Sequence, residues 1–325
     1  MKVIDLYRAI ITSLFLLGII GSICANDTIT QDSIKWGLSR ISVAHVRVKP
    51  GHSSELSNQA TMGMPIKLLE KHGDWWKVET PEGYNGYIIE NSLAIKPLEE
   101  MNQWRNANRV IVTSIYQTYI YKTPSDSNIR DVVTDVVNGV ILEGKKCDEE
   151  YSKVYLPDGR CGYIKSSAII PLEEWANQEF NPQLILDMAY SMHGLTYLWG
   201  GTSTKALDCS GLAKVCYFAN GIILKRDAYQ QAETGTKLDA NEWKECKAGD
   251  LLFFGNPKTK RVTHVAIYDK DGMYIHASGR VKVNSIDPQN ELYLSTPFFH
   301  SCRISDSIGS EGITQAINHP WYFNK

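Results

Sequence analysis

The sequence predicts a multidomain protein in which two small all-β barrels precede an α+β domain. Three observations support this fold class: a segment of the first half recurs, each copy consists of short β-rich runs broken by turn residues, and helical periodicity begins after Asn181. A chain of 325 residues is also longer than one average domain. We therefore expect a leader at 1–25, barrels at 30–100 and 105–175, and the α+β domain at 180–325.

The N-terminus has the pattern of a secretory signal peptide. Basic residues precede a mostly apolar stretch at 9–20, which is too short to span a membrane, and Ala25 offers a small residue for cleavage. Cys24 is compatible with a lipoprotein, but Ile23 stands where a lipid-modification site requires a small residue. The pattern thus predicts an exported mature protein, periplasmic or extracellular, without a membrane span, and a lipid anchor is the less favoured alternative.

The first half of the chain contains an internal repeat. Residues 77–88 recur as residues 153–164, with Lys-Val, Pro, Gly and Gly-Tyr-Ile at matching positions, and each copy is followed by Pro-Leu-Glu-Glu. Short β-rich runs, such as 41–48 and 110–120, are separated by clusters of Gly, Pro, Asn and Asp, and no long helical period interrupts them. Two small barrels are the architecture that this pattern favours.

Charge and cysteine content limit the possible functions. The formal net charge of -2 gives no basic footprint, so a nucleic-acid partner is not expected. Cleavage after the leader leaves Cys147, Cys161, Cys209, Cys216, Cys246 and Cys302. If Cys209 stays reduced, at least one other thiol is unpaired; Cys147 and Cys161 lie in one predicted barrel and could form a disulfide or stay reduced. Cys216 has apolar neighbours, which predicts a buried thiol.

The α+β domain is predicted to start with two helices. Pro182 suits the first turn of one helix and Gly194 its end, and a second helix is expected from Asp208 to Asn220. The carboxylate of Asp208 can cap this helix, so that Cys209 lies in its first turn. The unpaired N–H groups and the helix dipole there favour a thiolate, and such sites lower a cysteine pKa from about 8.5 to roughly 3.5–7.5.

Two histidines follow on a predicted β-hairpin formed by 262–269 and 273–278, with a Lys-Asp-Gly turn between the strands. Alternation places the apolar residues of both strands on one face, and His264 and His276 on the other. Depending on the turn, His276 lies opposite His264 or opposite Ala266, so the two imidazoles are direct or diagonal neighbours.

These residue types predict covalent catalysis by a thiol. Cys209 would attack a carbonyl carbon, His264 would accept the thiol proton, and His276 would hold His264 in the correct tautomer. The backbone N–H of Cys209 is a candidate donor to the oxyanion. A zinc site is disfavoured because neither Cys-x-x-Cys nor His-Glu-x-x-His spacing occurs, and no cofactor is expected.

The repeated segments resemble bacterial SH3-like modules, which usually accompany cell-wall enzymes. The matching motifs are Val46-Arg47-Val48-Lys49-Pro50, Trp75-Trp76 and Gly86-Tyr87-Ile88. The last domain resembles the NlpC family of bacterial cell-wall cysteine peptidases, which implies a papain-like α+β fold with Cys209 as nucleophile, His264 as base and His276 as third residue. The matching motifs are Tyr197-Leu-Trp-Gly200-Gly201, Asp208-Cys209-Ser210-Gly211, Arg226-Asp227-Ala-Tyr-Gln-Gln231, Ala248-Gly249-Asp250-Leu-Leu-Phe253-Phe254, His264-Val-Ala-Ile and His276-Ala-Ser-Gly279.

The complete layout resembles the dipeptidyl-peptidase VI type of this family. The resemblance implies a γ-D-glutamyl-L-diamino-acid endopeptidase that cuts peptidoglycan stem peptides before diaminopimelate or lysine and prefers a free N-terminal L-alanine. It assigns Asp227 to the substrate amine, Tyr197 and Ser210 to the cleft, and Glu55 to the contribution of the first barrel. The chain departs from the pattern at Ala228, where a hydroxyl residue is often found. No partner other than peptidoglycan fragments is expected, and a monomer is the default.

Other interpretations remain open at this stage. The same Cys–His chemistry suits an amidase or an acyltransferase, and the chain could also be a non-catalytic wall-binding protein whose barrels act as spacers. Residue types alone favour Asp227 as a solvated loop carboxylate or a turn residue. They also favour Tyr197 and Trp199 as packing aromatics.

Overall fold

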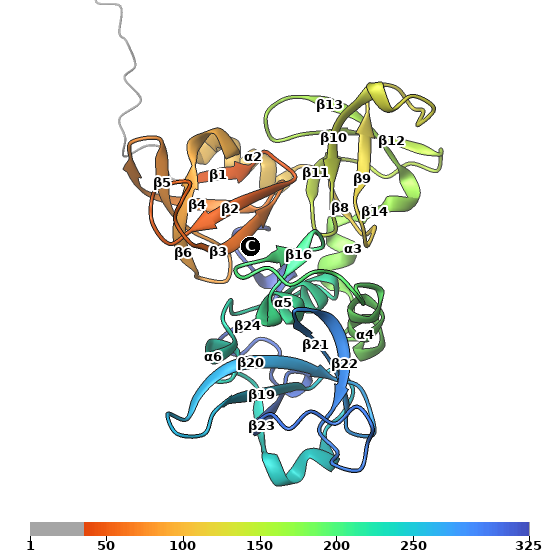
Figure 1. The fold of residues 1–325 in the computed structure, drawn as a ribbon. Coiled ribbons are helices and arrows are strands. Elements are labelled where there is room, and N and C mark those ends of the chain that lie inside the picture. Colours follow the sequence, from red (N-terminus) through yellow and green to blue (C-terminus); the bar gives the residue numbers. More distant parts are fainter. Residues whose placement is uncertain (1–35, 325) are drawn as a thin grey trace, which may run out of the picture. The chain divides into compact units, whose positions relative to one another are not determined.

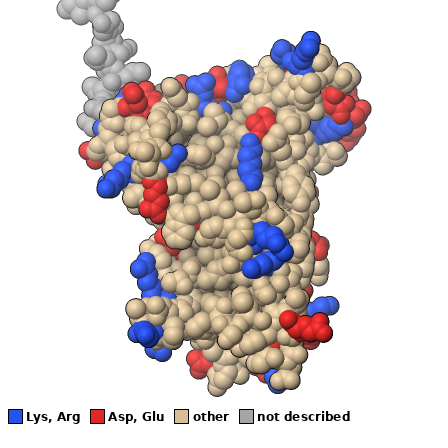
Figure 2. All heavy atoms as spheres, viewed as in Figure 1, with Lys and Arg blue, Asp and Glu red and all other residues tan. Residues whose placement is uncertain are grey.

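The computed structural model describes residues 36–324. The expected signal peptide and its cleavage site lie outside the described residues. Within the described part, no helix is long and apolar enough to cross a membrane. On the face shown in Figure 2, basic and acidic side chains are interspersed rather than gathered by sign, as the small net charge leads one to expect.

The first barrel is an antiparallel seven-stranded sheet with the strand order β3-β2-β6-β5-β4-β1-β7 (Figure 1). Its strands form because buried apolar residues such as Val46, Val78 and Ile88 alternate with more exposed ones. A short helix, α2 (Leu98–Asn106), follows the sheet. The strands are β1 (Trp36–Ser39), β2 (Val43–Arg47), β3 (Leu56–Thr61), β4 (Pro65–His72), β5 (Trp75–Glu79), β6 (Asn85–Ile89) and β7 (Leu93–Lys96).

The second barrel repeats this topology, with the order β10-β9-β13-β12-β11-β8-β14, in which each strand takes the place of its counterpart in the first sheet. The repeat predicted from the sequence is therefore a repeat of the fold. Helix α3 (Leu172–Asn177) follows. The strands are β8 (Arg109–Val112), β9 (Thr118–Tyr121), β10 (Val132–Val136), β11 (Ile141–Gly144), β12 (Tyr151–Tyr155), β13 (Cys161–Lys165) and β14 (Ile169–Pro171).

The predicted single run at 110–120 is wrong, because the chain forms two strands there. β8 and β9 are not neighbours in the sheet, so the chain must leave the sheet after β8 and cross to another place in it before β9 begins. The residues between them do not enter the core, since Ile115 and Tyr116 are 37% and 54% exposed. Apolar composition alone suggested a longer strand than the barrel can accommodate.

The two cysteines of the second barrel are free thiols. Cys147 Sγ contacts the carbonyl oxygen of Tyr151 at 3.2 Å, at the start of β12, whereas Cys161 is paired with Tyr155 at the other end of that strand. Four residues of strand correspond to about 13 Å, and a disulfide requires Cα atoms within about 7 Å. The disulfide alternative is therefore incompatible with this register.

The last domain has helices against one face of an antiparallel six-stranded sheet, ordered β18-β23-β19-β20-β21-β22. This is the α+β architecture that the sequence predicts. The helices are α4 (Pro182–Ser191), α5 (Cys209–Ala219) and α6 (Ala228–Gln231). The sheet strands are β18 (Thr236–Asp239), β19 (Leu251–Asn256), β20 (Arg261–Tyr268), β21 (Met273–Ser278), β22 (Arg280–Ser285) and β23 (Phe298–Arg303).

Short elements complete the described chain. Two small ladders are formed by β15 (Thr202–Ser203) with β16 (Ala206–Leu207) and by β17 (Ile222–Leu224) with β24 (Ile313–Gln315). The 3-10 helices are η2 (Glu90–Ser92), η3 (Ile129–Asp131), η4 (Ser166–Ala168), η5 (Ala240–Glu245), η6 (Ser305–Ser307) and η7 (Ala316–Asn318).

The predicted helix starts and strand faces are confirmed. Asn181 caps α4 just before Pro182, and Asp208 caps α5, with the Gly211 N–H donating to its carboxylate at 2.7 Å. On β20 and β21, alternate residues share the core with α4 and α5, while the intervening ones form a second cluster on the other face. This packing holds the start of α5 against β20.

The barrels and the last domain share buried contacts. One apolar cluster combines Leu38 of the first barrel, Ile111 of the second, Trp175 of α3 and Tyr322 near the C-terminus. Gln59 of β3 and Thr202 of β15 exchange hydrogen bonds across the first barrel's boundary, at 2.9 and 3.0 Å. The barrels are therefore packed parts of one structure rather than modules on free linkers.

Candidate active site

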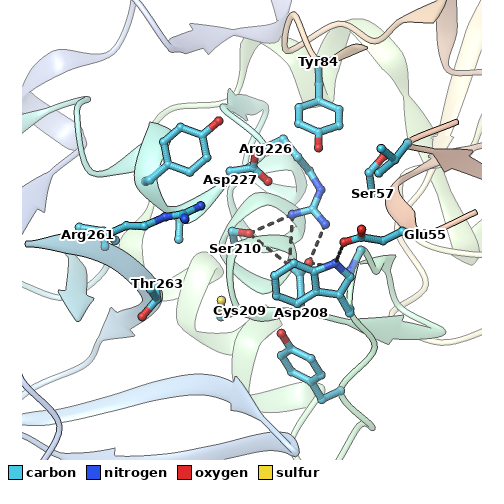
Figure 3. Close-up of a pocket in the computed structure, with 17 residues that line it drawn as sticks. Glu55, Ser57, Tyr84, Asp208, Cys209, Ser210, Arg226, Asp227, Arg261 and Thr263 are labelled. Carbon is cyan, nitrogen blue, oxygen red and sulfur yellow. Dashed lines mark hydrogen bonds and ion pairs between the residues drawn. The ribbon is translucent and has the colours of Figure 1, made fainter. Parts of the chain in front are cut away.

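A cavity of about 540 Å³ opens where the first barrel meets the start of α5 (Figure 3). The barrel contributes four of its lining residues and the last domain contributes the others. The lining residues are Val48, Glu55, Ser57, Tyr84, Tyr197, Trp199, Gly200, Asp208, Cys209, Ser210, Arg226, Asp227, Ala228, Tyr229, Arg261, Val262 and Thr263. Five of the seven predicted site residues thus meet in one cavity, namely Cys209, Ser210, Tyr197, Asp227 and Glu55, whereas His264 and His276 are not among its lining residues.

A buried ion pair holds the start of α5. The Arg226 guanidinium, 2% exposed, donates to both carboxylate oxygens of Asp208, at 2.6 Å from Nη2 and 3.2 Å from Nη1. Arg226 Nη1 also donates to Ser210 Oγ at 2.9 Å, and Ser210 Oγ donates to Asp208 at 3.2 Å. The residues on both sides of Cys209 are therefore fixed by charge-assisted hydrogen bonds.

The role of Arg226 was not predicted from the sequence. Its guanidinium is hydrogen-bonded to Asp208 in the cavity (Figure 3), although 18 residues separate the two in the chain. The only signal for it was its place directly before Asp227 in the motif that carries the family resemblance. A carboxylate that caps a helix needs no arginine, so the pairing follows from the tertiary fold.

Burial controls the protonation of Cys209. The side chain is 8% exposed, and burial, followed by the charge of Asp208, raises its pKa to about 11. The backbone N–H groups of Val265 and Ser210 act in the opposite direction by donating to the sulfur. The lowered pKa expected at a helix start is therefore wrong, and a raised pKa favours the neutral thiol at pH 7.

A chain of hydrogen bonds orients the two histidines. His264 Nε2 lies 2.7 Å from His276 Nδ1, and His276 Nε2 lies 3.0 Å from Asn284 Oδ1. The Asn284 amide nitrogen donates to the Leu292 carbonyl at 3.0 Å, which leaves its oxygen to accept. His276 must then carry its proton on Nε2 and accept from His264 Nε2, so His264 Nδ1 is left as the free base.

Both imidazoles are neutral near pH 7. Burial, then the neighbouring His276 and Lys282, lowers the pKa of His264 to about 3. Burial also lowers the pKa of His276 to about 4, although the hydrogen bond to Asn284 acts against this. A neutral thiol and a neutral imidazole base therefore face the reaction, rather than a preformed thiolate–imidazolium pair.

His264 comes directly after Thr263, which lines the cavity, but His264 itself is not a lining residue. The structure contains no hydrogen bond between Cys209 and the His264 ring among its described residues, but the N–H of Val265, the next residue, contacts the Cys209 sulfur. The ladder pairs Ile267 with Ile275, which places His276 opposite Ala266, one of the two expected registers.

Asn284 was missed because its strand was not predicted. β22 pairs with β21 along its whole length and carries Asn284 next to Tyr274, within reach of His276. The sequence 280–285 alternates polar and apolar residues, which is a weak strand signal. Its proximity to the histidines follows only from the sheet order.

Carboxylates and aromatic residues form the other side of the cavity. Asp227 lies at the N-cap of α6, and burial, together with the nearby Asp208, raises its pKa although Arg226 opposes this. Glu55 accepts a hydrogen bond of 2.6 Å from Trp199 Nε1. Trp199 is 62% exposed at the rim, so its expected packing role is wrong. Tyr84, whose pKa is raised by burial and by Asp227, is a further unpredicted member.

Two family models match the chain. The model of the NlpC/P60 family matches residues 194–303, which include Cys209, His264 and His276, and the bacterial SH3 domain model matches residues 42–94. Several known proteins are similar to the chain in sequence. Dipeptidyl-peptidase 6 from Lysinibacillus sphaericus is 29% identical over 261 residues, covering 77% of this chain and 92% of its own.

A gamma-D-glutamyl-L-lysine dipeptidyl-peptidase from Bacillus cereus is 29% identical over 250 residues, covering 74% of this chain and 72% of its own. The probable endopeptidase NlpC from Escherichia coli is 38% identical over 119 residues, covering 36% and 75%. An NlpC/P60 family protein from Bacillus cereus has a similar fold, with a TM-score of 0.70 at 22% identity over 82% of this chain and 99% of that chain. The chain belongs to the NlpC/P60 family of cell-wall cysteine peptidases.

Proposed function

We propose that the protein hydrolyses the bond between γ-D-glutamate and diaminopimelate or lysine in peptidoglycan stem peptides that begin with a free L-alanine. The observation that carries this proposal is the single cavity in which the thiol of Cys209 faces the carboxylates of Asp227 and Glu55. The names of the two dipeptidyl-peptidase relatives support the same reaction class. The expected signal peptide supports an exported enzyme that meets its substrate outside the cytoplasm.

The geometry suits an acyl-enzyme mechanism. Cys209 Sγ attacks the γ-carbonyl carbon while its proton passes to His264 Nδ1, and the N–H at the start of α5 donates to the oxyanion. When the tetrahedral intermediate collapses, the imidazolium of His264 gives its proton to the departing amine of the diamino acid. A water molecule, deprotonated by His264, then attacks the thioester, and the tetrahedral intermediate expels the Cys209 thiolate, which regains its proton from His264 as L-Ala-D-Glu is released.

The carboxylates explain a preference for a free amino terminus. An ammonium group that enters a cavity needs a carboxylate close by, since burying it unpaired is costly. Asp227 and Glu55 supply that charge from opposite domains, and Tyr84 lies beside them. A stem peptide still joined to the glycan has an amide nitrogen at this position, and it would leave both carboxylates without a cation.

A digest of defined peptides tests the proposal. Mass spectrometry of products from L-Ala-γ-D-Glu-diaminopimelate should show the L-Ala-γ-D-Glu dipeptide and free diaminopimelate. The N-acetylmuramoyl form of the same peptide should be cut far more slowly. If the enzyme cuts only the muramoyl peptide, the proposal is wrong, and cleavage at the bond between the lactyl group and L-alanine would identify an amidase.

Asp227→Asn tests the amine contact. Asparagine still caps α6, so the fold should persist, while the loss of the charge should lower kcat/KM for the free-amine tripeptide about 30- to 100-fold, equivalent to about 2–3 kcal/mol. Turnover of the N-acetylated tripeptide, measured by the same chromatographic assay, should hardly change. Asp187→Asn, which alters an exposed carboxylate on α4, is the matched control. Equal losses on both peptides would contradict an amine contact.

Asn284→Leu tests the order of the histidine relay. Without an acceptor at His276 Nε2, the ring can adopt the other tautomer, and kcat should fall about 10- to 100-fold with little change in KM. Asn284→Asp keeps an acceptor and adds a negative charge, which raises the pKa values of the histidines. The acid limb of its kcat/KM profile should therefore move to higher pH. An unshifted acid limb would show that Asn284 does not act through His276.

A further inference from the structure

The cavity contains two arginines in different situations. Arg226 is buried and neutralised by Asp208 at 2.6 Å. Arg261 is exposed at the start of β20, and none of the ion pairs within the described chain includes it. In Figure 3, the Arg261 side chain extends toward Ser210 from the side of the cavity opposite Glu55. This cation therefore faces the cavity without a protein anion.

The position of Arg261 is set by regular structure. β20 pairs with β19 through Asn256 and Arg261, next to a register shift between Phe254 and Gly255 where Thr263 of β20 has no ladder partner. A side chain at Gly255 would meet the Arg261 carbonyl oxygen at 2.1 Å, so the strands approach there as only glycine permits. The turn between them is closed by the Lys260 N–H, which donates to the Asn256 carbonyl at 2.8 Å. Arg261 thus projects from an anchored strand, and its backbone does not have to be ordered by a ligand.

The lining next to Arg261 includes the hydroxyl groups of Thr263 and Tyr229, which can donate to an anion, but its other arginine, Arg226, is already paired with Asp208. Helix α6 packs against β20, and its first residue, Ala228, lines the cavity with no polar side-chain atom. Glu55 and Asp227 have no ion-pair partner in the described part of the chain, so they can pair with a substrate cation but would repel a substrate anion. The cavity therefore carries separate positive and negative sites, which matches a ligand with an ammonium group and a carboxylate.

We propose that Arg261 binds a carboxylate of the substrate and so selects free-acid peptides over their amides. This inference rests on the proposed function. A glutamate joined through its γ-carboxyl keeps its α-carboxylate free, and diaminopimelate carries a second carboxylate that lysine lacks. Both are planar anions that the guanidinium can bind through two parallel hydrogen bonds.

Three tripeptides separate the two sources of the carboxylate: L-Ala-γ-D-Glu-L-Lys, its isoglutamine analogue with an α-amide, and L-Ala-γ-D-Glu-diaminopimelate. If Arg261 binds the α-carboxylate, Arg261→Ala should lower kcat/KM about 10-fold on both free-acid peptides and leave the amide unchanged. If Arg261 binds the second carboxylate of diaminopimelate, kcat/KM should fall only for the diaminopimelate peptide. Either result supports the inference, and raising the salt concentration should reduce the difference.

The control is Lys258→Ala, which removes an exposed cation from the same hairpin but outside the cavity lining. Arg261→Lys should recover only part of the discrimination, because an ammonium lacks the planar fork. Unchanged ratios among the three peptides in Arg261→Ala, or an equal change in Lys258→Ala, would overturn the inference alone. If the wild-type enzyme cuts none of the three at the γ-glutamyl bond, the proposed function fails and the inference with it.

Discussion

We expect Cys209→Ala to abolish hydrolysis of the tripeptide and to leave the fold unchanged. The sulfur is the atom that forms the acyl-enzyme, so kcat should fall by at least about 10⁴-fold, to the background of the assay. The substitution removes one buried atom beside the Asp208 cap, which itself stays intact, and the unfolding free energy should change by only about 1 kcal/mol. Product release followed by chromatography and thermal unfolding followed by circular dichroism measure the two effects. Residual turnover of even one per cent would refute the nucleophile.

Cys216→Ala is the matched control. Cys216 lies on the same helix and is completely buried, so its loss should lower stability slightly without affecting turnover. If both variants lose activity equally, the loss reports damage to α5 rather than removal of the nucleophile.

The raised pKa of Cys209 adds a pH test. Below a pKa of about 11, the thiolate fraction rises about tenfold for each unit of pH. The rate of alkylation by a small thiol reagent in the absence of substrate should therefore still increase from pH 7 to pH 9. A rate that is already constant above pH 7 would indicate a thiolate formed by the helix start or by His264, as the sequence predicted.

The elements that carry the candidate residues could be predicted because they depend on local patterns. A capped helix start, a two-residue period along a hairpin and a turn with glycine place Cys209, His264 and His276 on defined elements. The same patterns predict the repeat, since its turn residues recur at matching positions. These signals extend over a few residues each, and the structure follows them closely.

The unpredicted features arise from burial and from contacts distant in sequence. The pKa of Cys209 is raised because the start of α5 is buried beside Asp208, which no pattern in the sequence reveals. Arg226 reaches the site from the segment between β17 and α6, and Asn284 reaches it from β22. Tyr84 reaches it from another domain. The packing role expected for Trp199 is wrong because its partner, Glu55, belongs to the first barrel. An aromatic residue at a domain boundary can stay exposed while it donates to a carboxylate.

The first barrel is held to the last domain by a buried ion pair between Glu82 and Lys214. Their side chains are 2% and 9% exposed, and Glu82 also accepts a hydrogen bond of 2.7 Å from Asn58. Glu82→Ala leaves the ammonium of Lys214 buried without a partner, so the free energy of unfolding should fall by about 3–5 kcal/mol. Urea denaturation followed by tryptophan fluorescence measures this loss.

Adding Lys214→Met to Glu82→Ala removes the orphaned charge and should recover much of the lost stability. If the double variant is as unstable as Glu82→Ala, packing around Glu82, rather than the ion pair, accounts for the effect.

The same pair predicts a pH dependence whose sign follows from Glu82. Burial alone would raise its pKa, but the charge and hydrogen bond of Lys214, together with hydrogen bonds from the backbone and Asn58, outweigh burial and hold the pKa below its usual 4.5. The pair therefore stabilises the protein above pH 4.5, and this contribution is lost as the pH falls through the lower, folded-state pKa.

Because Lys214 lies on the helix that begins at Cys209, loosening the pair should also displace Glu55 and Tyr84 from the cavity. Glu82→Ala should then lose kcat/KM for the free-amine tripeptide more than for its N-acetylated form, whereas an equal loss would show that the barrel does not contribute to amine recognition.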